Sequence, residues 1–164
     1  MSDQLNLYDN ISGIASESSI LKMNTYSIKR TLIFIAFLDF IFQIINGFSY
    51  ALDHNNQNLY LSYTSFILAT FILIGICGIN RYNSCVSQMY GIYVAIKMIT
   101  FLGIIFYYKL SFVGFIFVLL VIILNIWILK LLCKFFKNLN NLSTQDIESL
   151  KSGWKPNIHN IILI

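Results

Sequence analysis

The chain has 164 residues, of which 57% are hydrophobic and only 11% charged, and its formal net charge is +4. A soluble domain is closer to half apolar and a quarter charged, so this composition, with a mean hydropathy of +0.72, is typical of a protein embedded in a lipid bilayer. The 14 Phe and 10 Tyr exclude a disordered chain, and the length leaves no room for a separate catalytic domain.

The first 30 residues are polar and rich in serine, and we expect them to form a flexible cytosolic tail. No pattern of a cleavable signal peptide precedes the first apolar run, so the first span is expected to act as an uncleaved signal anchor. Four apolar stretches follow, each about 20 residues long, which is the length that a helix needs to cross the hydrocarbon core. They are Thr31–Tyr50, Leu59–Ile79, Met89–Tyr108 and Phe112–Leu132.

These stretches predict an all-α fold. An open sheet in lipid would leave backbone groups without hydrogen-bond partners, and a membrane barrel would show alternating hydrophobicity instead of continuous apolar runs. Residues 31–132 are therefore expected to form an integral membrane four-helix bundle with short connections. Residues 133–164 are expected to form a cytosolic tail.

The positively charged residues predict the orientation of the spans. Of the 11 Lys and Arg residues, nine lie on the side of both termini, Lys109 lies on the opposite side, and Lys97 lies within a span. We call these two sides the near side and the far side. Because cytosolic segments carry the excess of positive charge, both termini are expected in the cytosol. The acidic N-terminal segment is unlike a mitochondrial presequence, which favours an endomembrane or the plasma membrane over the mitochondrial inner membrane.

Two charged residues lie deep inside the predicted spans, where a charge costs about 2.5–3.5 kcal/mol on insertion scales. Asp39 and Lys97 each lie eight residues from the near-side start of their span, a depth of about 12 Å, which predicts an ion pair between the first and third spans. Thr70 and Asn125 lie at a similar depth in the second and fourth spans, and Gln43 follows Asp39 by one turn. Together these five residues form a predicted polar layer.

Polar residues continue the layer along one face of two spans. They are Gln43 and Asn46 at i+4 and i+7 from Asp39, and Tyr90, Tyr93 and Thr100 at helical spacing around Lys97. Three interpretations of the layer remain open. The groups pair to fix the register of the helices, Asp39 titrates in a proton or ion relay, or Lys97 reaches the near-side interface while Asp39 pairs with another chain.

The near-side end of the fourth span carries basic residues and a cysteine. Lys130, Lys134 and Lys137 recur on one face of a helix, where they contact anionic head groups or simply mark the cytosolic end of the span. Cys85 and Cys133 lie at the cytosolic boundary, where reversible palmitoylation is a candidate modification and unmodified thiols are the alternative.

A short helix is predicted over residues 144–152. Ser143 is expected to cap its N-terminus, with Asp146 three residues later. Its apolar side consists of Ile147, Leu150 and Trp154. Because tryptophan favours the bilayer interface, this helix is expected to lie along the membrane surface, with docking to a protein partner as the alternative.

No motif indicates catalysis or a cofactor. The two His and three Cys lack the spacing of metal ligands, and the sequence contains no G-x-S-x-G, H-E-x-x-H or phosphate-binding glycine loop. We therefore expect a protein that is not an enzyme and has no cofactor or metal. Its expected partners are the lipid bilayer and other membrane proteins or further copies of itself, and not nucleic acid.

Short sequences at the ends of the spans carry a family resemblance. They are Arg30-Thr31 at the start of the first span, Gly78-Ile79-Asn80-Arg81 at the end of the second, and Cys133-Lys134 after the fourth. With this span pattern, the chain resembles the small four-span vesicle proteins of the MARVEL and lysosomal LAPTM type. The resemblance implies a role in membrane trafficking or membrane organisation.

Three functions remain open. The first is a protein that organises or accompanies other membrane proteins, and the second is an accessory subunit of a large membrane complex such as a respiratory assembly. The third is a small ion-coupled transporter that uses Asp39 and Lys97, although no helix is broken by Gly or Pro as in transporter binding sites.

Overall fold

The computed structural model of the protein describes the backbone of residues 2–52, 56–107 and 111–155, and the side chains of residues 17–52, 59–107 and 111–155. Five helices and no strand occur in these ranges, as the all-α prediction requires. They are α1 (Ser2–Leu52), α2 (Asn56–Asn80), α3 (Ser84–Tyr107), α4 (Phe112–Asn141) and α5 (Thr144–Lys151). The first four contain segments long and apolar enough to cross a membrane, namely Glu17–Leu52, Leu59–Asn80, Ser84–Tyr107 and Phe112–Asn141.

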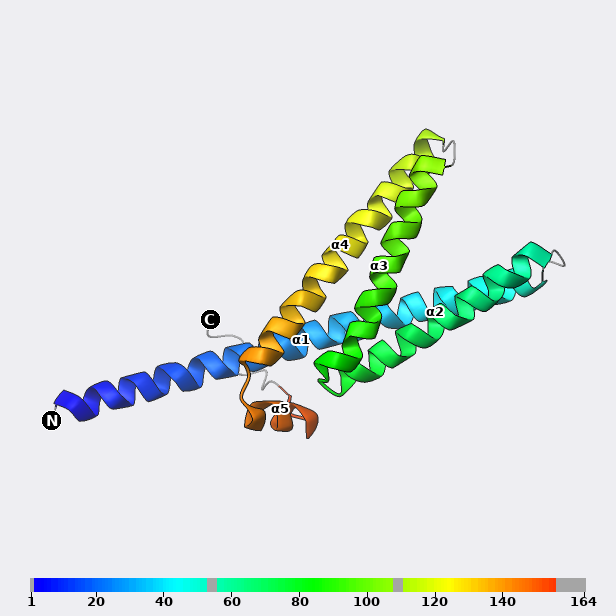
Figure 1. Cartoon of the computed structure of the whole chain (residues 1–164). Coiled ribbons are helices and arrows are strands. Elements are labelled where there is room, and N and C mark those ends of the chain that lie inside the picture. Colours follow the sequence, from blue (N-terminus) through cyan, green and yellow to red (C-terminus); the bar gives the residue numbers. More distant parts are fainter. Residues whose placement is uncertain (1, 53–55, 108–110, 156–164) are drawn as a thin grey trace.

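The N-terminal segment is helical, which corrects the prediction of a flexible tail over residues 1–30. α1 is one continuous helix of 51 residues, about 77 Å long, whereas a hydrocarbon core is about 30 Å thick. A polar composition does not itself end a helix, and proline, which would, is absent from this segment. In Figure 1 the N-terminal part of α1 (blue) projects well beyond the other helices.

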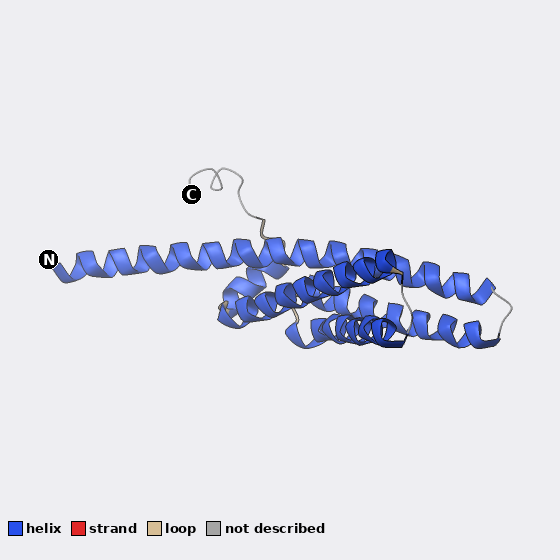
Figure 2. Ribbon diagram, turned by 90° about the horizontal axis from the view of Figure 1, so that it is seen from above, coloured by secondary structure: helices blue, strands red, loops and turns tan. Residues whose placement is uncertain are grey.

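The four long helices form two antiparallel hairpins, α1–α2 and α3–α4. The two hairpins meet at their near-side ends and diverge toward their far-side tips (Figure 1), and the view from above shows α1 running the full length of the molecule (Figure 2). The extensive contacts run from α1 to α2 and from α2 to α3, and those between α3 and α4 are fewer. The four helices are thus packed together at the near side only. The predicted four-helix bundle would also have been packed at the far side.

A tight turn joins the two hairpins. α2 ends in the hydrogen-bond pattern of a Schellman motif, in which the Asn83 N–H donates to the Gly78 carbonyl (2.9 Å) and the Tyr82 N–H donates to the Ile79 carbonyl (3.2 Å). Tyr82 occupies the left-handed position with φ 51°, where glycine is usual. Its ring stacks on Phe135 at a centroid distance of 6.3 Å, and the Lys29 Nζ atom lies 4.1 Å from its centroid. These contacts hold a strained residue in place.

Two glycines allow α2 and α3 to approach closely beside this turn. A Cβ atom on Gly75 would lie 2.5 Å from the Cβ atom of Tyr90, and one on Gly78 would lie 2.3 Å from the backbone nitrogen of Ser87. Small residues let helix backbones approach in the same way in other membrane proteins, where close packing replaces the hydrophobic effect as the source of stability.

The buried core lies in the near-side half of the molecule. Its fully buried large side chains are Leu32, Ile72, Ile79, Tyr90, Tyr93, Val94, Ile128, Leu132 and Phe135. The far-side ends carry exposed apolar side chains instead, such as Phe106 (83% exposed) and Phe112 (79% exposed). Exposed apolar side chains occur in the near-side half as well, such as Phe34 (64% exposed), so what distinguishes this half is its buried core.

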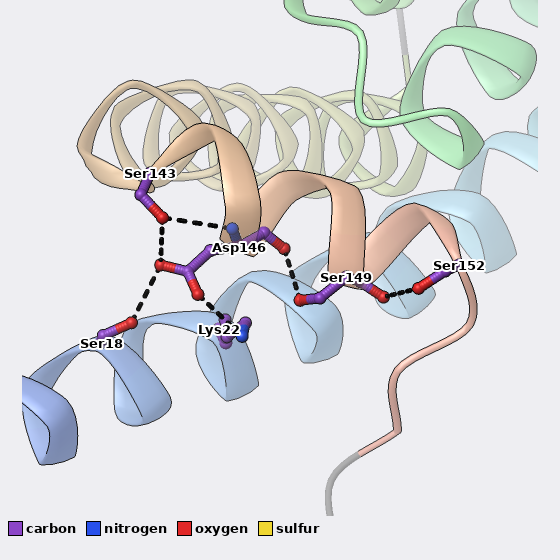
Figure 3. A network of polar contacts seen from close by, with 6 residues as sticks. All are labelled: Ser18, Lys22, Ser143, Asp146, Ser149 and Ser152. Atoms are coloured by element: carbon purple, nitrogen blue, oxygen red, sulfur yellow. Dashed lines mark hydrogen bonds and ion pairs between the residues drawn. The ribbon is translucent and has the colours of Figure 1, made fainter.

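The short helix α5 forms close to its predicted position, with Ser143 as its N-cap: the Asp146 N–H donates to the Ser143 Oγ atom (3.2 Å). The Asp146 carboxylate also joins α5 to α1, because it pairs with Lys22 at 2.7 Å and accepts a hydrogen bond from Ser18 at 3.0 Å (Figure 3). Leu150 is buried, and Trp154 packs edge-on against Tyr26 of α1.

The apolar side of α5 therefore packs on the protein itself, and its place along the membrane surface stays a prediction. The end of the predicted C-terminal segment, residues 156–164, lies outside the described residues.

Candidate functional site

A buried carboxylate connects α1 to α3 inside the near-side half. Asp39 is 8% exposed, and its Oδ1 atom lies 2.5 Å from the Lys97 Nζ atom in an ion pair. Its Oδ2 atom accepts a hydrogen bond of 2.9 Å from the Tyr90 hydroxyl. Both carboxylate oxygens therefore have a charged or polar donor, which is what a buried charge requires.

A second contact lies one turn farther along each helix. The Gln43 Nε2 atom donates to the Tyr93 hydroxyl at 3.2 Å, and the Tyr93 ring stacks on that of Tyr90 at a centroid distance of 5.9 Å. The Lys97 Nζ atom lies 5.7 Å from the centroid of Tyr93, within the range of a cation–π contact. We call the five residues Asp39, Gln43, Tyr90, Tyr93 and Lys97 the Asp39 cluster.

The Asp39 cluster carries much of the connection between the first and third helices. α1 and α3 share few backbone contacts, since α2 packs against both of them. Long polar side chains therefore bridge the two helices at the level where the hairpins are still together. The Asp39 and Lys97 side chains are 11% and 22% exposed, so the pair is largely shielded by the chain itself. A shielded pair with matched donors is suited to fixing helix register.

Two members of the predicted polar layer do not join this cluster. Thr70 is exposed and donates to the carbonyl of Phe66 in its own helix (3.0 Å), which corrects its predicted place in the layer. Asn125 is fully buried, but its Nδ2 atom donates to the carbonyl of Val121, one turn earlier (2.7 Å). The Asn125 Oδ1 atom has no hydrogen-bond partner within the part of the chain that the structure describes.

The sequence predicts the face on which Tyr90 and Tyr93 lie but not their hydrogen bonds. Tyr90 precedes Lys97 by seven residues and Tyr93 precedes it by four, so the helical spacing placed both on the same face. What the spacing could not show is that the hydroxyls reach α1, since this depends on how α2 separates the two helices.

The polar stripe of α1 continues beyond the cluster to Asn46. This residue follows Gln43 by less than one turn and lies about 6 Å from the far-side end of the predicted span at Tyr50. Asn46 is exposed, and its amide has no hydrogen-bond partner among the described residues. Thr100, on the facing stripe of α3, is also exposed and donates to the carbonyl of Ile96 in its own helix (3.0 Å). The polar stripes thus stop meeting each other toward the far side.

The remaining predicted site residues lie on the near-side surface. Lys130, Lys134 and Lys137 are all exposed on α4, which at 30 residues, or about 45 Å, extends beyond the thickness of a hydrocarbon core. Cys85 and Cys133 are exposed free thiols. Head-group contact and palmitoylation at these residues stay predictions.

Within the described ranges, no group of three or more His, Cys, Asp or Glu residues is arranged to hold a metal ion. The chain was also compared with protein families, with curated proteins and with solved structures. None of the three comparisons gave a match.

Proposed function

We propose that this chain is a four-span membrane protein without enzymatic activity that accompanies or organises other membrane proteins by receiving a partner's transmembrane helix between its two hairpins. Both termini face the cytosol, in an endomembrane or the plasma membrane. The observation that carries the proposal is the polar stripe of α1. This stripe is paired with α3 at Asp39 and Gln43, and at Asn46 it has no hydrogen-bond partner among the residues whose side chains the structure describes.

Exposed apolar side chains on the far-side half do not by themselves indicate a partner, because lipid tails are as apolar as leucine. An exposed amide is different. Removing an amide from water without a hydrogen bond costs about 1–3 kcal/mol by mutational measurements in proteins. The Asn46 amide lies on the stripe that faces α3 at Asp39 and Gln43. Its position favours a partner's helix that offers a polar group to the Asn46 amide.

The Asp39 cluster supports pairing over transport. In a proton or ion relay, the carboxylate has to exchange its partners as the substrate passes. Both oxygens of Asp39 are instead bonded to Lys97 and Tyr90, and the ion pair is largely shielded. The cluster then acts as the fixed joint from which the two hairpins diverge. The role agrees with the membrane organisation that the resemblance to the MARVEL and LAPTM proteins implies.

The native size of the full-length protein in mild detergent tests the proposal, with mass-spectrometric identification of co-migrating proteins. We expect a stoichiometric assembly with another membrane protein, and Asn46→Leu is expected to release that partner while the chain stays folded. Ile45→Leu is the matched control, since Ile45 is exposed at the same depth but about 100° around the helix.

Three outcomes separate the alternatives. A large assembly of many subunits would identify the chain as an accessory subunit, the special case of an accompanying protein. A lone monomer, or a dimer unaffected by Asn46→Leu, would contradict the proposal. In that case a flux assay in proteoliposomes with Asp39→Asn would be the next experiment, and loss of flux would indicate a transporter.

A further inference from the structure

An open cleft of about 880 Å³ lies at the near-side end of the molecule. Its walls come from three parts of the chain: Tyr26 and Lys29 of α1, the α2–α3 turn from Asn80 to Cys85, and α5 with the residues that follow it. The bonds of Asp146 to Lys22 and Ser18 hold the α5 wall in place (Figure 3). The cleft is therefore built by tertiary contacts and is separate from the Asp39 cluster.

The described residues that line the cleft are strongly basic. Lys29, Arg81, Lys151 and Lys155 line it, with Glu148 as the acidic lining residue. Lys29 is partly engaged, because its Nζ atom donates to the carbonyl of Asn80 at 2.9 Å. The other three basic side chains are exposed and make no ion pair with a described residue. Three free cations around one cleft favour a ligand that carries several negative charges.

The cleft lies level with the predicted near-side ends of the first two spans. Lys29 lies two residues before the predicted start of the first span at Thr31, and Arg81 lies two residues after the predicted end of the second at Ile79. The cleft is therefore at the depth of the lipid head groups. Tyr26 and Trp154, which pack together in its wall, are residue types enriched at that depth.

We infer that this cleft binds the phosphate-bearing head group of an anionic lipid in the near-side leaflet, with Arg81, Lys151 and Lys155 contacting the phosphate. Arginine provides paired donors for phosphate oxygens, and basic pockets at the cytosolic ends of membrane helices suit phosphorylated head groups. The basic stripe Lys130, Lys134 and Lys137 does not line this cleft, so it offers only general attraction to anionic lipids.

The test measures lipid binding to the full-length protein by native mass spectrometry. The probes are phosphatidylinositol 4-phosphate, phosphatidylserine and phosphatidylcholine, together with soluble inositol 1,4-bisphosphate, which is the head group of the first lipid without its tail. The cleft variant is Arg81→Gln with Lys151→Gln and Lys155→Gln. The control variant carries Lys130→Gln, Lys134→Gln and Lys137→Gln, which removes the same charge from the same side of the membrane.

We expect phosphatidylinositol 4-phosphate to bind more tightly than the other two lipids, and the cleft variant to lose about tenfold or more of that affinity. The control variant is expected to keep most of it. Glu148→Gln removes the acidic lining residue without disturbing a described ion pair, and is expected to strengthen binding.

Several outcomes would overturn the inference: equal losses in the two charge variants, full binding by the cleft variant, or weaker binding by Glu148→Gln. Binding of inositol 1,4-bisphosphate as tight as that of the lipid would identify a free phosphate compound as the ligand in place of a lipid. The cleft does not include Asn46, so this inference and the proposed partner contact can each fail without the other.

Discussion

The near-side and far-side halves of the four long helices differ in how closely the two hairpins pack against each other. The near-side half packs glycine against backbone, buries large side chains from all four helices and pairs its one described intramembrane carboxylate on both oxygens. In the far-side half the hairpins diverge, apolar side chains are exposed and a polar amide is left without a partner in the described chain (Figure 1). The comparison indicates that contacts between the two hairpins are concentrated at the near side (Figure 1), whereas the far side keeps contacts within a hairpin, such as the hydrogen bond from the Ser62 hydroxyl to the Gly47 carbonyl (2.8 Å).

The largest effect is expected from removing one member of the ion pair. Lys97→Met leaves the Asp39 charge largely shielded and without its counter-charge, and we expect it to lower the free energy of unfolding by about 2–4 kcal/mol. Exchange of the two residues, Asp39→Lys with Lys97→Asp, restores opposite charges and should recover a large part of this loss. Unfolding in mixed micelles of increasing denaturing detergent measures both variants. An unchanged unfolding midpoint for Lys97→Met would show that the Asp39 cluster does not stabilise the contact between α1 and α3.

A smaller effect is expected from replacing a glycine by alanine, and it should differ between the near-side and far-side halves. Gly78→Ala places a methyl group 2.3 Å from the Ser87 backbone nitrogen, and we expect destabilisation by about 1–3 kcal/mol because backbone must move. Gly103 lies in the far-side part of α3, where an added Cβ atom meets nothing within 4 Å. Gly103→Ala is therefore expected to be neutral or slightly stabilising, since alanine favours helix. Thermal unfolding of the two variants in detergent gives the comparison, and equal losses would contradict a packed near side and an open far side.

A smaller effect concerns the docking of α5. The hydrogen bond from Lys22 is the main cause that lowers the pKa of Asp146 to about 2, with Ser143 and Ser18 contributing. Because the folded-state pKa lies below the ordinary value of 3.8, the contribution of Asp146 to docking is complete above that pH and is lost as the pH falls toward 2.

The fluorescence of Trp154, measured in a Trp127→Phe background, reports this change because the Trp154 ring packs against Tyr26. We expect the emission to change as the pH falls from about 4 to about 2, and Asp146→Asn to show the altered emission already at neutral pH. Glu148→Gln on the same helix is the control and should behave like the parent. A parent-like emission in Asp146→Asn would show that α5 docks through its apolar side chains alone.

The smallest effect is expected at Tyr82, in the turn between α2 and α3. Burial and the neighbouring Tyr26 raise the pKa of Tyr82 to about 12, so its hydroxyl stays neutral at all ordinary pH values. Tyr82→Phe should therefore leave the unfolding midpoint nearly unchanged, because the buried hydroxyl has no hydrogen-bond partner among the described residues. Loss of stability in this variant by thermal unfolding would indicate a partner for the hydroxyl.

The sequence predicted those features that depend on a single helix or on depth in the membrane. Continuous apolar runs located the four long helices, the Ser143 and Asp146 pattern located α5, and equal distances from the near-side interface brought Asp39 opposite Lys97. Each of these follows from helix geometry and from the cost of placing polar groups in lipid.

The features that depend on how helices pack against each other could not be predicted in this way. Equal depth placed Thr70 in the polar layer, but depth does not fix rotation about the helix axis, and Thr70 faces outward. Polar composition suggested a flexible tail before residue 31, whereas contacts of Ser18 and Lys22 with α5 accompany a helix there. The close approach of α2 to α3 at Gly75 and Gly78 is likewise a matter of packing between helices, which the sequence of one helix does not fix.

Site-specific photo-crosslinking in native membranes shows whether a partner's helix lies beside Asn46. A photoreactive residue is placed at Asn46 in one variant and at Ile45 in another, and crosslinked products are compared by size and mass spectrometry. We expect a defined adduct with a membrane protein from position 46 and much less from position 45, because only the first lies on the polar stripe, at a point where no described residue pairs with it. Adducts of equal yield at both positions, or lipid adducts alone at position 46, would contradict it.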